Sequence, residues 1–147
     1  PTLELTGKEL EDTIQKLKIA SFIQFTLPGV PSIYYGDEIG MQGFRDPYNR
    51  KTFSKKEINE EIFTHYKALT AFRTEYKEDF KGNFNVVYEN GGCLVFQRES
   101  LLCAVNMNDH TEYIEGLHGK QIFASHQTRN HPNGILVPAN GFAAYQI

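Results

Sequence analysis

The spacing of apolar residues changes near residue 80, and this change limits the fold more than any other feature of the sequence. Before it, apolar residues recur at intervals of three and four, which is typical of amphipathic helices. After it, they alternate with polar residues between turns rich in Gly and Asn, which is typical of β-strands. The sequence therefore predicts a helical part over residues 1–80 and a β domain over residues 81–147.

Two helices are predicted in the first part. The first begins at Thr6, where Glu9 follows at the spacing of a capping box, and it ends at Pro28. The second begins near Ser54, where Glu57 has the same spacing. The end of the first helix is apolar on most sides, which predicts cover by more than one neighbouring element.

The segment between the two helices predicts one strand and one long loop. Residues 32–35 are β-branched and aromatic and predict a short buried strand. Residues 36–53 show no periodicity, and loops of this length are usually functional or mobile. One strand cannot pair both edges within two helices, and little in this part covers the apolar helix end. We therefore expect residues 1–80 to complete a larger α/β structure. The chain starts at Pro1 rather than Met, which fits a piece of a longer protein.

The second part is predicted to be an antiparallel sandwich or barrel. Asn90-Gly91 is a strong hairpin signal, because both residues tolerate positive φ. About seven short strands in roughly 65 residues fit either architecture. The strands are expected at residues 84–88, 93–97, 101–105, 111–114, 121–124, 135–137 and 142–147. The fold class is therefore α+β.

Charge and composition exclude several function classes. A net charge of −3 argues against a nucleic-acid partner, and no apolar run approaches the roughly 20 residues that span a bilayer. Cys93 and Cys103 form no CxxC pair and are expected to be reduced and semi-buried, with a single disulfide as the alternative. His126 and His131 have no evident third ligand for a metal. We expect a cytoplasmic protein without a metal, a cofactor or a membrane partner.

Three strings of residues resemble one enzyme family. Residues 29–41, GVPSIYYGDEIGM, resemble the segment around the eighth barrel strand of the α-amylase superfamily, glycoside hydrolase family 13. Residues 46–50, DPYNR, resemble the D-P-x-x-R loop of neopullulanases, cyclomaltodextrinases and related α-glucosidases. Residues 69–73, LTAFR, are similar to the L-I-A-L-R stretch of the eighth barrel helix. The part after Lys81 matches the C-terminal β-sandwich of these enzymes in position and length.

The resemblance implies a particular fold and activity. Residues 1–80 would be the last helix–strand–helix part of a (β/α)₈ barrel, which needs about 250 residues in all, and residues 81–147 its antiparallel C-terminal β-sandwich. Retaining glycoside hydrolysis needs two carboxyl groups about 5–5.5 Å apart. In the family these groups and a third acid would all lie upstream of Pro1. The parent would be a glycoside hydrolase acting on α-glucosidic bonds, while this chain would hold no catalytic residue and be inactive alone.

Asp46 and Arg50 are the predicted substrate-binding residues. They lie four residues apart, on one face of a short turn that Asp46 is expected to cap, with Pro47 at its first position. A carboxylate beside a forked donor suits the vicinal hydroxyls of a sugar, and the resemblance implies that the pair holds a glucose unit near subsite −2 of an α-glucan or maltooligosaccharide. The alternative is a salt bridge that only stiffens the loop.

Other polar and aromatic candidates are expected to be structural. Asp37 and Glu38 are adjacent on an extended segment and point to opposite faces, so Asp37 is expected to cap a turn and Glu38 to accept from an Arg or backbone donors. Phe44 either offers a platform for a sugar face or packs on the barrel rim. His65 is expected on the solvent face of the second helix.

Two rival functions and several details stay open at this stage. One rival is a non-catalytic carbohydrate-binding or interaction module, which would need a row of exposed aromatic rings on the sandwich. The strand aromatics are instead expected to face the core; they are Phe84, Tyr88, Phe96 and Tyr145. The other rival is a relative that has lost catalysis.

Dimerisation to a homo-oligomer, disorder and rearrangement are alternative ways to cover the strand at residues 32–35. Bond preference, α-1,4 against α-1,6, and hydrolysis against transglycosylation are also open.

Overall fold

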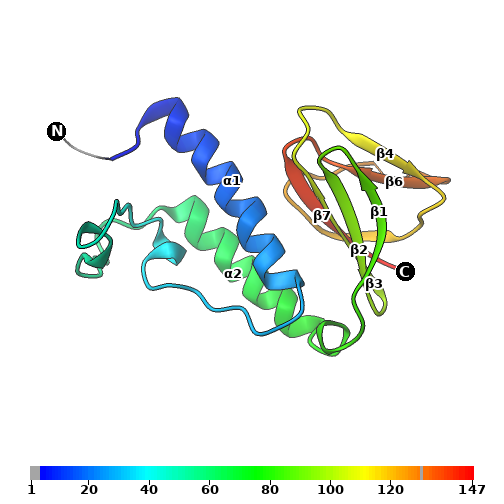
Figure 1. Ribbon diagram of the computed structural model, residues 1–147, viewed down its shortest axis with the longest axis horizontal. Coiled ribbons are helices and arrows are strands. Elements are labelled where there is room, and N and C mark those ends of the chain that lie inside the picture. Colours follow the sequence, from blue (N-terminus) through cyan, green and yellow to red (C-terminus); the bar gives the residue numbers. More distant parts are fainter. Residues whose placement is uncertain (1–3, 130) are drawn as a thin grey trace.

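The computed structural model describes residues 4–129 and 131–147 of the chain. Helices α1 (Gly7–Thr26) and α2 (Glu60–Glu75) run in the same direction, and the segment between them returns past both (Figure 1). Short 3₁₀ turns occupy Asp37–Ile39, Tyr48–Arg50 and Asp79–Lys81. The strands are β1 (Asn85–Asn90), β2 (Cys93–Arg98), β3 (Leu101–Asn106), β4 (Glu112–Glu115), β5 (Lys120–Ala124), β6 (Gly134–Val137) and β7 (Gly141–Gln146).

Both helices form, but their starts differ from the predictions. Thr6 is the N-cap residue of α1, yet its side chain makes no capping hydrogen bond, so the predicted capping box is wrong. The second helix starts at Glu60 rather than near Ser54. Its N-cap is Asn59, whose Oδ1 accepts from the Ile62 N–H at 3.1 Å. Ser54 and Asn59 are both good capping residues, and only Asn59 directly precedes the turn that packs Ile62 into the core.

The predicted buried strand at residues 32–35 is not formed. Ile33, Tyr34 and Tyr35 are 38%, 51% and 41% exposed, and no strand of the described residues pairs with them. A strand needs a neighbour that satisfies its backbone N–H and C=O groups. The segment therefore connects the two helices as an extended chain that has no β-ladder hydrogen bonds.

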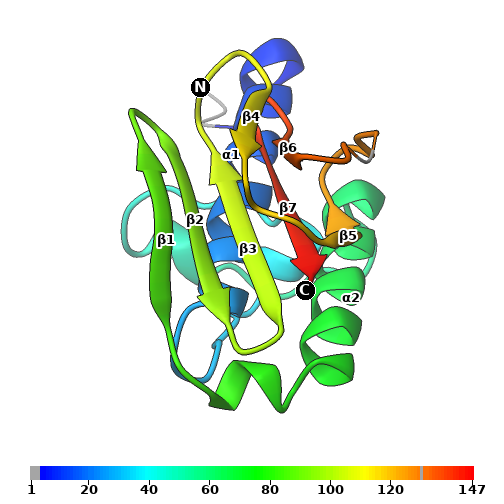
Figure 2. The ribbon, with the colours of Figure 1, turned by 90° about the vertical axis from the view of Figure 1, so that its right-hand side faces the viewer.

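The β part is an antiparallel sandwich, as predicted, and all seven predicted strands are confirmed with small shifts at their ends. A five-stranded sheet has the order β1-β2-β3-β7-β5, and a two-stranded sheet pairs β4 with β6. The helices lie behind the larger sheet in Figure 2, and the smaller sheet covers its other face. Every residue of β3 is buried because this strand lies in the middle layer.

The helices and the larger sheet share one apolar core. The ring of Phe22 in α1 is fully buried and stacks on Phe142 in β7 at 4.5 Å between centroids. Phe72 in α2 stacks on Phe123 in β5 at 4.8 Å. The prediction that more than one neighbouring element covers the apolar end of the first helix is therefore confirmed, since both α2 and the sheet contact it. The domain boundary at residue 80 stays a prediction.

The carbonyl groups at the end of α1 are held by two arginines. Arg98 in β2 is 1% exposed and donates from Nη1 to the Thr26 oxygen at 2.6 Å. Arg73 in α2 donates to the oxygens of Phe25 at 2.5 Å and Gly29 at 2.7 Å. The last carbonyls of a helix have no partner within the helix, so these arginines fix the direction in which the chain leaves α1.

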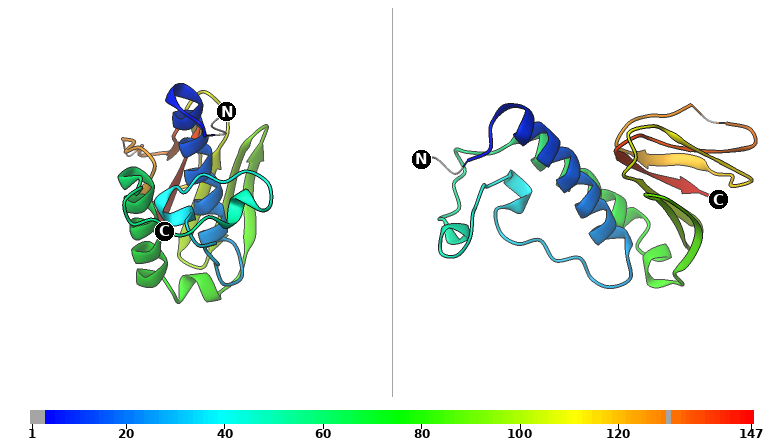
Figure 3. Two further views of the ribbon diagram at one scale, coloured as in Figure 1. Left: turned by 90° about the vertical axis from the view of Figure 1, so that its left-hand side faces the viewer. Right: turned by 45° about the horizontal axis from the view of Figure 1, so that its top comes forward.

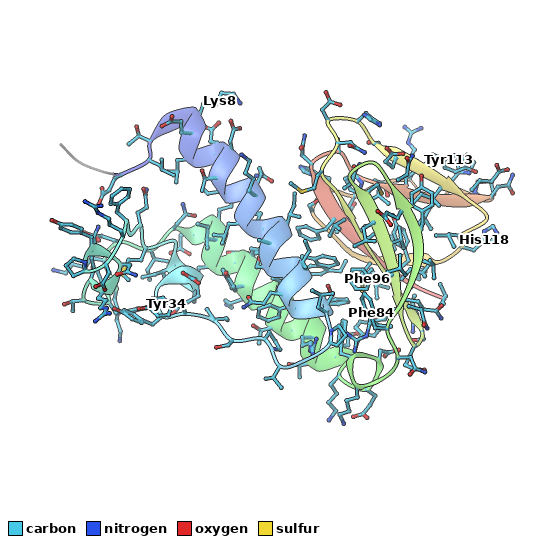
Figure 4. All side chains as sticks on the ribbon, viewed as in Figure 1. Lys8, Tyr34, Phe84, Phe96, Tyr113 and His118 are labelled. Atoms are coloured by element: carbon cyan, nitrogen blue, oxygen red, sulfur yellow. The ribbon has the colours of Figure 1, made fainter. Side chains whose placement is uncertain are left out.

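The strand aromatics follow the prediction in part. Phe96 and Tyr145 are buried, as expected, and Tyr88 is half-buried against the core between the two sheets. Phe84 precedes the edge strand β1 and is 36% exposed, so the prediction that it faces the core is wrong. Its ring centroid lies 5.1 Å from that of Phe96 (Figure 4). These four rings do not form an exposed row.

His65 is buried rather than on the solvent face. Its Nε2 lies 2.8 Å from Ser21 Oγ in α1, and its ring centroid lies 5.7 Å from that of Phe142. The prediction is wrong because β7 covers this face of α2. Burial, followed by the positive charge of Lys18, lowers the pKa of His65 to about 4.

Both cysteines are free and buried, which confirms their reduced state and excludes the alternative of a disulfide in this structure. Cys103 belongs to the core beneath the helices, and Cys93 belongs to the core between the two sheets. The two thiols therefore lie on opposite faces of the larger sheet. No helix in the described part of the chain has the length and apolar character needed to cross a membrane.

Candidate functional site

The loop at residues 36–53 lies at the end of the helical part that is remote from the β-sheets (Figure 3). It begins with a compact turn that requires glycine, because Gly36 and Gly40 have φ of 94° and 70°. The Met41 N–H donates to the Gly36 oxygen at 2.9 Å, and a Cβ at position 36 would lie 2.5 Å from the Met41 Cε. Ile39 is buried in this turn, and its oxygen accepts from the Asn59 N–H, which ties the loop to the start of α2.

Of the two adjacent acids Asp37 and Glu38, it is Glu38 whose side chain holds this turn. Glu38 Oε2 accepts from the Gly36 N–H at 2.8 Å, which confirms the predicted backbone donor. The N-cap position belongs to Gly36, and no side chain caps the turn, so the predicted cap by Asp37 is wrong. Burial, followed by the charge of Glu38, raises the pKa of Asp37.

The structure brings the two predicted binding residues together. Arg50 Nε lies 2.7 Å from Asp46 Oδ1, and the two side chains are 70% and 61% exposed. The expected cap by Asp46 does not form, because Pro47 is the N-cap residue of the Tyr48–Arg50 turn and makes no side-chain bond. Exposed ion pairs add only about 0–1 kcal/mol to stability. The pair therefore stabilises the loop only weakly, and it leaves a carboxylate and a guanidinium exposed to solvent.

An aromatic groove adjoins this ion pair. Tyr34, Tyr35, Phe44 and Tyr48 line a hollow of about 290 Å³, together with the polar residues Asp37, Gln42 and Asn49. The Tyr34 and Tyr35 centroids lie 4.9 Å apart. The Tyr35 hydroxyl donates to the Lys51 oxygen at 3.2 Å, which links the extended segment to the end of the loop. Figure 4 shows Tyr34 at the loop end of the molecule.

Sequence reasoning missed most of this groove. The tyrosines at 34 and 35 were predicted to lie in a buried strand, and Tyr48 and Asn49 lie between the two predicted binding residues. The spacing of Phe44 and Tyr48, four residues apart around Asp46, is the signal that indicates a shared surface. Phe44 is 54% exposed and lines the groove, and the Arg45 guanidinium carbon lies 5.9 Å from the centre of its ring.

The structure offers little for metal binding in the part of the chain that it describes. No three His, Cys, Asp or Glu side chains of residues 4–129 and 131–147 gather as metal ligands. His126 and His131 lie on exposed segments of the β part.

Comparison with known protein families defines the class of protein to which the chain belongs. Residues 2–83 match the family described as alpha-amylase, catalytic domain. The chain belongs to this α-amylase family, which confirms the resemblance and the α+β fold expected from it.

Its relatives are α-glucan enzymes that are much longer than this chain. It is 36% identical over 107 residues to the cyclomaltodextrinase of Thermoanaerobacter pseudethanolicus, covering 69% of this chain and 19% of that protein. It is 41% identical over 70 residues to neopullulanase 2 of Thermoactinomyces vulgaris, covering 46% of this chain and 12% of that protein. The crystal structure of the debranching enzyme of Nostoc punctiforme superposes with a TM-score of 0.78 at 26% identity, covering 91% of this chain and 31% of that one.

Proposed function

We propose that this chain is the C-terminal part of a retaining α-glucan hydrolase of the neopullulanase or cyclomaltodextrinase type. The observation that carries the proposal is the family match to a catalytic domain, which covers residues 2–83 and includes the loop and both helices. The chain accounts for only 19% of the cyclomaltodextrinase that it resembles. The remainder of a (β/α)₈ barrel, which needs about 250 residues, would supply the rest of the site.

A large unpartnered groove supports this placement. It has a volume of about 710 Å³ and lies between Ile33 and the outer face of α2, where Phe63, Tyr66 and Ala71 are among its lining residues. Unpartnered apolar faces of this kind mark surfaces that bury against other elements. The missing barrel units are the natural occupants, because they would also pair with the extended segment at residues 32–35.

In this proposal the loop forms one wall of the sugar cleft. The Asp46 carboxylate accepts hydrogen bonds from glucose hydroxyls, and the Arg50 guanidinium donates to them. The exposure of both side chains and their 2.7 Å contact support this role, because the pair is preformed and open to a ligand. The substrate is an α-glucan or a maltooligosaccharide.

The catalytic carboxylates would lie in the rest of the enzyme, and this chain alone would be inactive. Retaining hydrolysis places two carboxyl groups about 5–5.5 Å apart across the scissile bond. Of the adjacent acids of the loop, Glu38 serves the turn instead, since its carboxylate accepts from the Gly36 N–H. The free buried cysteines support a cytoplasmic site of action, because disulfides are rare there.

The test uses the natural protein and this chain side by side. Reducing-sugar release from maltodextrin is expected for the natural protein and not for residues 1–147 alone. Turnover by the 147-residue chain would overturn the assignment of the catalytic groups to the missing part. Asp46→Ala in the natural protein is expected to raise KM for maltooligosaccharides, and an unchanged KM would reject the binding role of the pair.

A further inference from the structure

The dipeptide Asn-Gly occurs three times in the β part, at Asn90-Gly91, Asn133-Gly134 and Asn140-Gly141. It is chemically labile, because the backbone nitrogen of the second residue can attack the Asn side-chain carbonyl, and glycine has no side chain to hinder that approach. All three Asn residues are exposed to water. The surroundings of the three glycines therefore decide which pair reacts in the folded protein.

Gly91 lies in the open turn of a hairpin at the edge of the larger sheet. Gly91 and Gly92 form the two-residue turn between β1 and β2, and Asn90 pairs with Cys93 at the end of the ladder. β1 is an edge strand of the sheet (Figure 2). Among the described residues the Gly91 N–H donates no hydrogen bond, and a Cβ built on Gly91 would meet no atom within 4 Å. The Gly91 nitrogen is therefore accessible, and only the last pair of the ladder has to open for the attack.

The other two glycines belong to strands and are buried. Gly134 begins β6, where it pairs with Glu115 in β4 and forms a further bridge with His131. Gly141 begins β7 and pairs with Asn106 in the central strand β3. The backbone at both positions is therefore held in place, and the preceding Asn reaches the attacking geometry only if a strand opens.

We propose that Asn90 is a site of spontaneous deamidation in the folded protein, whereas Asn133 and Asn140 are protected. The Gly91 nitrogen loses its proton to a base in solvent and forms a bond to the Asn90 Cγ. The amide C–N bond then breaks, and ammonia leaves with a proton taken from solvent. Water opens the resulting five-membered succinimide at either carbonyl and yields aspartate or isoaspartate. One water is consumed for each ammonia released, and this inference does not depend on the proposed function.

The isoaspartate product alters the hairpin more than the aspartate product does. In isoaspartate the main chain runs through the former side chain, which adds a methylene group between residues 90 and 91. A two-residue turn fixes the register of the strands that it joins, so the longer link no longer matches the pairing of residue 90 with Cys93. Cys93 is 1% exposed in the unmodified hairpin. Its thiol is therefore expected to become more accessible in the isoaspartate form.

The experiment incubates the folded natural protein in mildly alkaline buffer and follows the three Asn residues by tryptic peptide mapping with mass spectrometry. The exchange of an amide for a carboxyl group is detected as a gain in mass, and fragment ions separate Asn133 from Asn140. The product at Asn90 is expected to form about tenfold faster than at the other two, because they must first open a strand hydrogen bond. In guanidinium chloride the three rates are expected to become similar, since all three sites share the sequence Asn-Gly.

Asn90→Gln is the matched control, because glutamine keeps the amide but cannot form the five-membered ring. It is expected to abolish the gain in mass of the tryptic peptide that spans residues 82–98. The isoaspartate form of the natural protein, separated by chromatography, is expected to react with a thiol reagent faster at Cys93 than the unmodified protein does. Cys103, which lies on the other face of the sheet, is expected to stay slow in both forms.

Three results would overturn the inference. The first is a rate at Asn133 or Asn140 in the folded protein that equals or exceeds the rate at Asn90. The second is deamidation at Asn90 that occurs only in denaturant. The third is a gain in mass of the same peptide that persists in Asn90→Gln. Equal labelling of Cys93 in the isoaspartate and unmodified forms would contradict the expected change in the hairpin.

Discussion

The Arg98 guanidinium lies against the C-terminal end of α1, where Nη1 donates to the Thr26 carbonyl oxygen at 2.6 Å. Its other nitrogens donate to Asn83 at 3.1 Å and to the Phe80 oxygen. This one side chain connects a strand of the larger sheet, the end of α1 and the segment that follows α2. It is the largest fully buried side chain of the described residues.

Arg98→Met is expected to destabilise the protein by about 3–5 kcal/mol, because several buried carbonyl groups lose their donor together. The free energy of unfolding is measured by guanidinium chloride titration. Arg129→Met removes an exposed arginine from the β part and is the matched control, with an expected change within about 0.5 kcal/mol. A loss for Arg98→Met no larger than that of the control would contradict the proposed role of this connection.

His65 is expected to make the protein sensitive to acid. Its pKa is lowered from 6.5 to about 4 in the folded state by burial and by Lys18, against the opposing charge of Glu61. The unfolded chain therefore binds the proton first as pH falls, so stability is full above the unfolded pKa of 6.5 and is lost between pH 6.5 and 4.

This loss is measured against His65→Gln, which cannot take a charge and can still hydrogen-bond Ser21. The unfolding free energy of the natural sequence is expected to fall by about 2–3 kcal/mol more than that of the variant between neutral pH and pH 4. Parallel curves for the two proteins would show that folding does not lower the pKa of His65.

The two thiols are expected to be inert in the folded protein. Burial raises the pKa of Cys93 to about 11 and that of Cys103 to about 12, so neither forms the reactive thiolate near neutral pH. Labelling with a thiol reagent is expected to be slow in buffer and to reach both cysteines in guanidinium chloride. Fast labelling of either thiol in buffer would contradict the burial seen here.

The ion pair of the loop is expected to matter for binding and not for stability. Arg50→Ala should change the unfolding free energy by less than about 0.5 kcal/mol, since exposed pairs stabilise little. In the natural enzyme it should raise KM for maltooligosaccharides about tenfold, the effect of one lost charge-assisted contact. Lys55→Ala, an exposed basic residue beyond the loop, is the control for charge alone. A loss of stability with an unchanged KM would support the stiffening role instead.

Local pattern was sufficient to predict the β part. Alternation and turns such as Asn90-Gly91 are short-range signals, and the strands of the sandwich pair within the chain itself. The segment at residues 32–35 carries an equally good strand signal, but no strand of the described residues pairs with it, so pairing decides the outcome. The start of α2 was missed because Ser54 and Asn59 are equivalent caps until tertiary packing selects one of them.

The candidate site was predictable only where one stretch of sequence holds the whole signal. Asp46 and Arg50 were found because both belong to the DPYNR string, which carries the family resemblance and places them four residues apart, and the structure joins them. The aromatic groove combines the loop with Tyr34 from the extended segment, and this contact depends on the return of the chain past α2. His65 was misplaced for the same reason, since β7 covers it from far along the sequence.

The most direct test of the account is the intact mass of the natural protein, measured by mass spectrometry on material purified from its source. The account predicts a species several times heavier than the 16.8 kDa of this chain, with this sequence inside it. A natural protein of 16.8 kDa would contradict the account, because no missing barrel would then exist to carry the catalytic carboxylates.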